Sequence, residues 1–69
     1  MTTETIKAYL VDTKCPILIC LSDGRKFIVA HQDFLIFHPV GDGIFLFQST
    51  GYYIVLNKNH ITSLEKSYV

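Results

Sequence analysis

The stretch of residues 43–57 carries no charged side chain, and both of its strand-like runs are apolar on both alternate faces. One alternate set is Phe45, Phe47, Tyr53 and Val55, and the other is Ile44, Leu46, Tyr52, Ile54 and Leu56. A half-solvated antiparallel strand alternates apolar with polar residues instead. One set can fill the protein interior, so the other set must meet a helix, a partner or water.

The composition favours β structure over helix. The chain of 69 residues holds eight Ile, five Val, five Phe and four Tyr, but only two Ala and one Met. β-branched and aromatic side chains suit a pleated sheet, whereas helices use more Ala and Leu. Because domains usually span about 50–200 residues, we expect a single small domain over residues 1–69.

The charges balance, with six Lys and Arg against six Asp and Glu. A protein that binds nucleic acid through bulk electrostatics carries a basic excess, so that class is excluded. The apolar run of residues 16–21 is shorter than the roughly 20 residues that cross a bilayer. Since no secretory signal pattern is present either, we expect a cytoplasmic protein without membrane contact.

The first residues have helical spacing. Ile6, Tyr9, Leu10 and Thr13 recur on one face, with Thr2 or Thr3 as the candidate N-cap. Proline disfavours helical geometry in the residue before it, so Pro16 prevents extension of the helix. The pattern predicts a short helix over about residues 4–11.

Turn residues divide the rest of the chain into short strands, expected at residues 16–21, 25–30, 34–37, 44–48, 52–56 and 60–64. The Asp23-Gly24 pair is typical of a type I′ hairpin, which needs positive φ at both central residues. Short strands with regular turns predict a mainly β fold. We expect a small five- to six-stranded antiparallel barrel, SH3-like or Sm-like, with one short N-terminal helix.

Three segments carry a resemblance to known sequences. Residues 21–27 read Leu-Ser-Asp-Gly-Arg-Lys-Phe, residues 31–39 contain His-Gln-Asp-Phe and His-Pro, and residues 60–65 read His-Ile-Thr-Ser-Leu-Glu. The pattern resembles a group of uncharacterised bacterial proteins of similar length with a Leu-x-Asp-Gly-Arg hairpin. Gln32 stands where that group usually has proline. The resemblance covers most of the chain from Pro16 onward and implies no particular activity.

The helix, the Asp-Gly turn and the closing segment of residues 58–63 also resemble the Sm-like family, whose bacterial members are RNA chaperones. That resemblance implies bent strands, assembly through strand edges, and an RNA pocket built by a Lys-His pair before the last strand. Lys58 and His60 match that pair, with Asn59 between them. Two features differ: residues 25–30 lack the glycine that bends the family's second strand, and Asp33 alone matches its first motif.

The cysteines and histidines do not form a recognisable catalytic or metal pattern. In one strand Cys15 and Cys20 would lie about 16 Å apart, too far for a disulfide, so we expect both to stay reduced and free of metal. His31, His38 and His60 lack a zinc-site spacing and are expected to make ordinary hydrogen bonds in turns. Asp33 is expected to stabilise a turn with its own backbone.

The sequence thus predicts a non-enzymatic interaction module with no catalytic residue, metal or cofactor. We expect a homo-oligomer, most simply a dimer, joined through Phe45, Phe47, Tyr53 and Val55; another protein partner stays open. RNA binding through Lys58 and His60 is the alternative. Tyr52 and Tyr53 could stack on bases, but consecutive strand residues point to opposite faces, so only one of them is expected to face outward.

Overall fold

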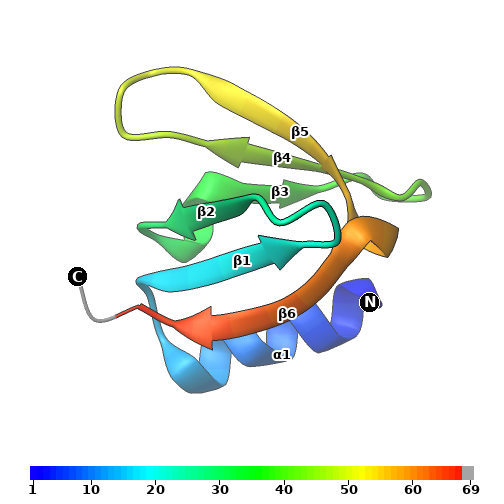
Figure 1. Ribbon diagram of the computed structural model, residues 1–69, viewed down its shortest axis with the longest axis horizontal. Helices are drawn as coiled ribbons and strands as arrows, with labels where there is room; N and C mark the ends of the chain where they lie inside the picture. The colour runs from blue at the N-terminus through cyan, green and yellow to red at the C-terminus, as the bar shows by residue number, and fades with distance from the viewer. Residues whose placement is uncertain (68–69) are drawn as a thin grey trace.

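One helix precedes six antiparallel strands in the computed structural model, which describes residues 1–67 (Figure 1). The elements are α1 (Thr3–Thr13), β1 (Ile17–Leu21), β2 (Lys26–Val29), β3 (Leu35–Phe37), β4 (Gly43–Phe47), β5 (Tyr53–Asn57) and β6 (Ile61–Lys66). Two 3₁₀ turns, η1 (Gln32–Phe34) and η2 (Lys58–His60), precede β3 and β6. The prediction of a mainly β chain with one N-terminal helix is confirmed.

The strands form two three-stranded sheets, with strand orders β2-β1-β6 and β3-β4-β5. The chain passes between the sheets twice, through η1 and through η2. Among residues 1–67 no strand pairing joins the two sheets, so the expected barrel is not closed. The reason is local: each 3₁₀ turn takes the chain out of extended geometry where a continuous strand would have linked the sheets.

Helix α1 is anchored at both ends. The Thr2 hydroxyl oxygen accepts a hydrogen bond from the Thr5 backbone N–H at 3.2 Å, which makes Thr2 the N-cap. At the other end Lys14 has a φ of 65° and donates its N–H to the Leu10 carbonyl. The helix buries Ile6 and Leu10 against the sheets, and so it depends on packing for its stability.

The core lies between the two sheets and the helix. It is built from buried aliphatic side chains: Ile6, Leu10, Ile17, Ile19, Leu21, Val29, Leu35, Ile44, Leu46, Leu56 and Ile61. No aromatic side chain belongs to this buried set among the described residues. The phenylalanines and the tyrosine of β4 and β5 therefore lie outside the buried core.

The β1–β2 hairpin turn differs from the expected type. Gly24 has a φ of 90°, but Asp23 does not have positive φ, so the predicted type I′ turn is wrong. The Gly24 N–H donates to the Leu21 carbonyl at 3.0 Å, and the Leu21 N–H donates to the Arg25 carbonyl at 2.9 Å. This is a three-residue loop in which one glycine supplies the left-handed position. Gly51, with a φ of 96°, has the same place in the β4–β5 hairpin.

Candidate self-association surface

The exposed face of the β3-β4-β5 sheet is the most unusual surface of the molecule. Ile44, Leu46 and Leu56 point inward and are buried. The other alternate set, Phe45, Phe47, Tyr53 and Val55, points outward, and each member is between 36% and 60% exposed. The choice between the two sets, which the sequence left open, is thus made by the packing of the inner set on the core.

Ile36 of β3 belongs to the same surface, with 51% of its area exposed. In the strand register it lies opposite Phe45, which in turn lies opposite Val55. Phe47 and Tyr53 form the next row. We call these five residues the apolar face. Sequence reasoning missed Ile36, although its place between buried Leu35 and half-buried Phe37 is the expected strand alternation.

The aromatic rings of the apolar face are arranged against one another. The ring centroids of Phe45 and Tyr53 lie 5.8 Å apart with an interplanar angle of 22°, and those of Phe47 and Tyr53 lie 6.0 Å apart at 50°. Offset aromatic pairs at such separations are favourable beyond their burial. Rings already held in place lose little conformational freedom when a partner covers them.

The apolar face is large for so small a molecule. Its five residues expose roughly 500 Å² together, if an aromatic side chain offers about 150–250 Å² and an aliphatic one somewhat less. The described residues expose 4563 Å² in all. Apolar patches of about 300–600 Å² are the largest on typical monomers and often mark interaction sites.

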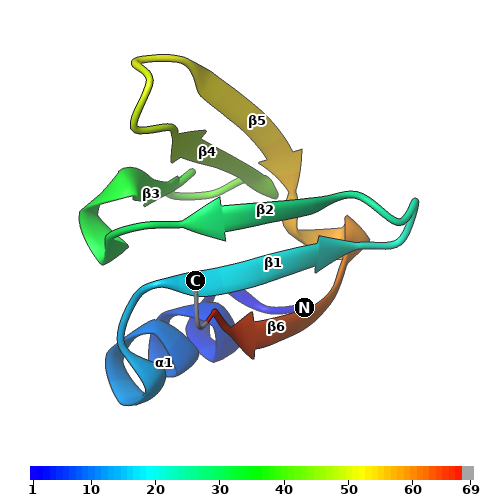
Figure 2. The ribbon, with the colours of Figure 1, turned by 60° about the vertical axis from the view of Figure 1, so that its left-hand side comes forward.

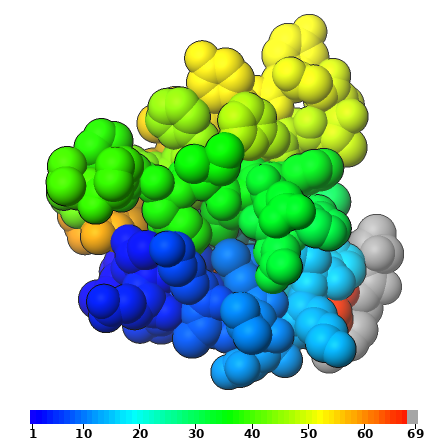
Figure 3. Space-filling model, turned by 180° about the vertical axis from the view of Figure 1, so that it is seen from behind, coloured from blue at the N-terminus to red at the C-terminus, as the bar shows by residue number. Residues whose placement is uncertain are grey.

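Helix α1 does not cover the apolar face. Its buried residues reach the core, and it contacts β6. The helix and the β4–β5 hairpin lie at opposite ends of the molecule in Figure 2 and, from behind, in Figure 3. The described chain therefore does not cover the outward set, and this set meets either a partner or water.

Tyr52 and Tyr53 are both exposed, so the prediction that one of them must point inward is wrong. The reason is that β5 begins at Tyr53, and Tyr52 lies just before the strand, next to the loop glycine Gly51. At this end of the hairpin no inner neighbour covers Tyr52, so the burial that strand alternation predicts does not follow.

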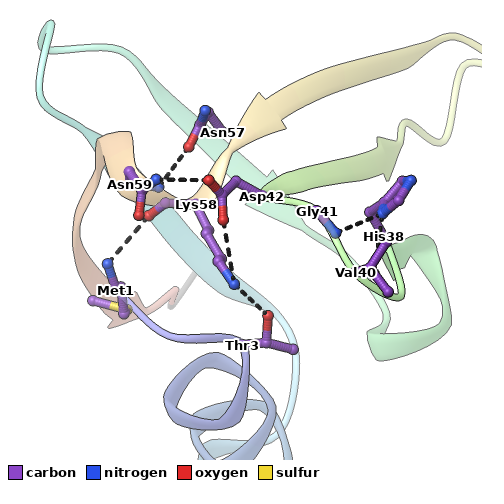
Figure 4. A network of polar contacts seen from close by, with 9 residues as sticks. All are labelled: Met1, Thr3, His38, Val40, Gly41, Asp42, Asn57, Lys58 and Asn59. Atoms are coloured by element: carbon purple, nitrogen blue, oxygen red, sulfur yellow. Dashed lines mark hydrogen bonds and ion pairs between the residues drawn. The ribbon is translucent and has the colours of Figure 1, made fainter.

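Lys58 is part of an intramolecular network (Figure 4). Its Nζ lies 3.6 Å from the Asp42 carboxylate and donates to the Thr3 hydroxyl at 3.3 Å. Its backbone N–H donates to the Asp42 carbonyl, and its carbonyl accepts from the Met1 ammonium. Asn59 adds an amide hydrogen bond to the other carboxylate oxygen of Asp42. The network ties the start of α1 to the corner between β5 and β6.

The structure does not bring Lys58 and His60 into one site. Lys58 lines a hollow beside the start of the helix, together with Thr3, Lys7 and His38. His60 lines a different hollow of about 480 Å³ between the β1–β2 hairpin and β5, together with Arg25 and Asn57. The Lys58 charge is also partly balanced by Asp42. The candidate RNA residues therefore face separate surfaces.

His31 and His38 each accept backbone hydrogen bonds in a turn. The Nδ1 of His38 accepts from the Val40 N–H at 3.1 Å and from the Gly41 N–H at 2.7 Å. The Nδ1 of His31 accepts from the Asp33 N–H at 3.1 Å. The expectation was that the Asp33 carboxylate would stabilise this turn, η1. Instead the His31 imidazole accepts the hydrogen bond that does so. Within residues 1–67 no three His, Cys, Asp or Glu side chains gather as metal ligands would.

The two cysteines occupy different environments, and both are free thiols. Burial raises the pKa of the Cys15 thiol, and the positive charge of Lys66 partly opposes that shift. The Cys20 thiol is buried on β1 and donates a hydrogen bond to a Glu65 carboxylate oxygen at 3.2 Å. The raised pKa of Cys15 disfavours a reactive thiolate at that position.

The chain matches no protein-family model, no curated protein and no solved structure. Within residues 1–67 no helix has both the length and the apolar character needed to cross a membrane. The candidate site therefore rests on the structure alone. It is the apolar face, an uncharged and largely aromatic sheet surface that no other part of residues 1–67 covers.

Proposed function

We propose that this chain is a non-enzymatic interaction module that associates with copies of itself through the apolar face. The observation that carries the proposal is the outward set on β4 and β5. Phe45, Phe47, Tyr53 and Val55 are exposed together, while every member of the core has found cover within the chain. Exposed aromatic groups on one contiguous face are typical of protein interfaces.

A second copy is the occupant that the chemistry favours. The apolar face contains no charged residue, so it offers no ion pair to a charged partner. Two such faces are complementary to each other and can meet around a two-fold axis. Together they would bury roughly 1,000 Å², which is about the lower bound for a specific interface before any rim contacts are added.

Lysine substitutions on the apolar face test this proposal. Phe47→Lys or Tyr53→Lys places a charge in the interface, and we expect light scattering to report half of the mass of the unchanged protein. Val11→Lys is the matched control, because Val11 is 67% exposed on α1 at the other end of the molecule. An unchanged mass in folded Phe47→Lys and Tyr53→Lys proteins would remove the basis of the proposal.

RNA binding of the Sm-like kind is the second candidate. The order of elements supports it, because one N-terminal helix precedes the strands and the last strand, β6, pairs with the first, β1. The separation of Lys58 from His60 speaks against a shared pocket. An RNA binder would bind single-stranded oligonucleotides with an affinity that falls steeply as salt rises. We expect no such binding, whereas self-association through an uncharged face is insensitive to salt.

A further inference from the structure

We propose that the free edge of β5 pairs antiparallel with β5 of a second copy and forms a two-fold contact centred on Val55. This inference rests on the proposed self-association and adds a second interface, which joins sheet to sheet at their edges. Among residues 1–67, β5 pairs only with β4, so its other side carries main-chain groups that no neighbouring strand uses. Such an edge is a template for another strand.

Each of the other edge strands has a feature that discourages pairing. β6 carries Glu65 and Lys66, has a register shift opposite β1, and contacts α1. β2 begins at Lys26, directly after Arg25, and β3 is three residues long with Pro39 close behind it. Charge, irregular pairing, short length and coverage are the usual protections of a sheet edge.

The edge of β5 has none of these features. Its five residues include no charge and no proline, and its register with β4 runs without a shift from Phe47↔Tyr53 to Gly43↔Asn57. A hollow of about 480 Å³ separates its C-terminal half from the β1–β2 hairpin, whose Asp23 and Arg25 line the other side. The strand is therefore uncharged and regular, and among residues 1–67 no strand pairs with this side of it.

The hydrogen-bond pattern shows which residues face the edge. The Lys58 N–H donates to the Asp42 carbonyl, and the Gln48 N–H donates to the Tyr52 carbonyl. Because main-chain groups in an antiparallel pair alternate in direction, even-numbered residues of β5 turn these groups toward β4. Tyr53, Val55 and Asn57 consequently turn theirs toward the free edge.

These three residues define a symmetric register. Pairing Val55 with Val55 of the second copy places Tyr53 opposite Asn57 at both ends, so every edge-facing group of the strand has a partner. The cross-strand row Ile36–Phe45–Val55 then continues into the same row of the second copy in reverse order. The result is a six-stranded sheet with one continuous apolar row across it.

The edge contact and the face contact are compatible. The two-fold axis of the edge contact is perpendicular to the sheet at Val55. A face contact whose axis runs along the Ile36–Phe45–Val55 row crosses it at a right angle. Two perpendicular intersecting two-fold axes close into an assembly of four chains. In that assembly two six-stranded sheets stack with their apolar faces together.

Val55→Pro tests the edge contact through the main chain, and it keeps an apolar side chain on the apolar face. Proline removes the edge-facing N–H, and sheets tolerate proline at such edge positions. We expect a folded protein with half of the wild-type mass by light scattering. Val55 also belongs to the apolar face, so Val55→Ala, which keeps the N–H but shortens the side chain, measures the part of any mass loss that comes from the face contact, and we expect its mass to exceed that of Val55→Pro. Ile54→Pro is the internal control, because its N–H faces β4, and we expect it to unfold the protein.

Combining the variants separates this inference from the proposed function. Phe47→Lys is expected to leave edge-paired dimers, Val55→Pro to leave face-paired dimers, and the double variant to be monomeric. A folded Val55→Pro protein with the wild-type mass overturns the edge contact alone. A mass halved by Val55→Pro but unchanged by Phe47→Lys overturns the face contact alone.

Hydrogen exchange gives a second readout that does not depend on a variant folding. In the assembled wild-type protein, the Val55 amide is expected to exchange much more slowly than an exposed amide, and its protection should fall when dilution dissociates the chains. A Val55 amide that exchanges as fast as an exposed one in the assembled protein would overturn the edge contact.

Discussion

The rings of Phe45 and Tyr53 stack on the outer surface of the sheet, with their centroids 5.8 Å apart, although the two residues come from different strands and are not direct cross-strand partners. Val55 is the residue opposite Phe45, so the stack runs diagonally across the β4–β5 pair. A diagonal contact of this kind fixes both rings before any partner arrives. The interaction surface is thus built into the hairpin itself.

Removing the Lys58 ammonium is expected to destabilise the fold. Lys58→Met loses the contacts to Asp42 and Thr3, and because the side chain is only 23% exposed we expect a loss of about 1 kcal/mol in unfolding free energy. Lys26→Met, on an exposed position of β2, is the control and should change little. Chemical denaturation of both variants makes the comparison. Equal stabilities would show that the network does not hold α1 in place.

The Lys58 network also shows where sequence reasoning reaches its limit. Local signals predicted α1 and the six strands, because capping residues, Pro16 and the glycine turns act within a few positions. Thr3 and Asp42 lie far from Lys58 in the sequence, and no spacing rule links the three. Lys58, a candidate RNA-binding residue in the sequence, therefore makes its charged contacts within the fold.

Gly41→Ala is expected to disturb the turn after β3. A Cβ at this position would lie 2.9 Å from the His38 Nδ1, in the ring that accepts the Val40 and Gly41 N–H groups. We expect a loss of about 1–2 kcal/mol in unfolding free energy from overpacking. Gly43→Ala is the control, since open space surrounds its Cβ position.

A double-mutant cycle connects this loss to His38. In a His38→Ala background the ring is gone, so Gly41→Ala should cost much less than it does in the wild-type chain. If Gly41→Ala costs the same in both backgrounds, the imidazole is not what the new methyl group meets.

Gln48→Met is expected to stabilise the protein. The Gln48 Nε2 is buried and has no hydrogen-bond partner among the described residues. Burying an unpaired amide costs about 1–3 kcal/mol, so an apolar side chain of similar length should raise the unfolding free energy by about 1 kcal/mol. The exposed Gln32→Met variant is the control in the same denaturation experiment, and a Gln48→Met protein less stable than the wild type would contradict the prediction.

Asp23 is expected to make stability depend on pH in the acid range. The Arg25 backbone N–H bound to its carboxylate is the main reason that its pKa lies below the ordinary 3.8, and the Arg25 guanidinium adds to the effect. A lowered folded-state pKa contributes stability above 3.8, which is lost as pH falls through the lower folded value. NMR titration of the Asp23 carboxyl measures that value.

Arg25→Gln separates the two causes of the Asp23 shift. This variant keeps the backbone N–H and loses the guanidinium, so most of the lowering of the Asp23 pKa should remain. An Asp23 pKa that returns to its ordinary value in Arg25→Gln would assign the effect to the side chain instead.

The self-association surface was predictable in kind but not in full. The missing charges in residues 43–57 predicted an uncovered apolar set. Which set it would be depended on tertiary packing, because Ile44 and Leu46 were as apolar as Phe45 and Phe47. The membership of Ile36 depended on the pairing of β3 with β4, and the opening of the barrel on two 3₁₀ turns. The choice of set and the membership of Ile36 depend on contacts between strands and not on local sequence.

The mass of the unmodified chain in solution tests the central claim most directly. Multi-angle light scattering at tens of micromolar, repeated at low and high salt, is the measurement. We expect at least twice the chain mass of 7.9 kDa at both salt concentrations, because an uncharged face holds the copies together. A mass of 7.9 kDa under both conditions would contradict self-association through the apolar face.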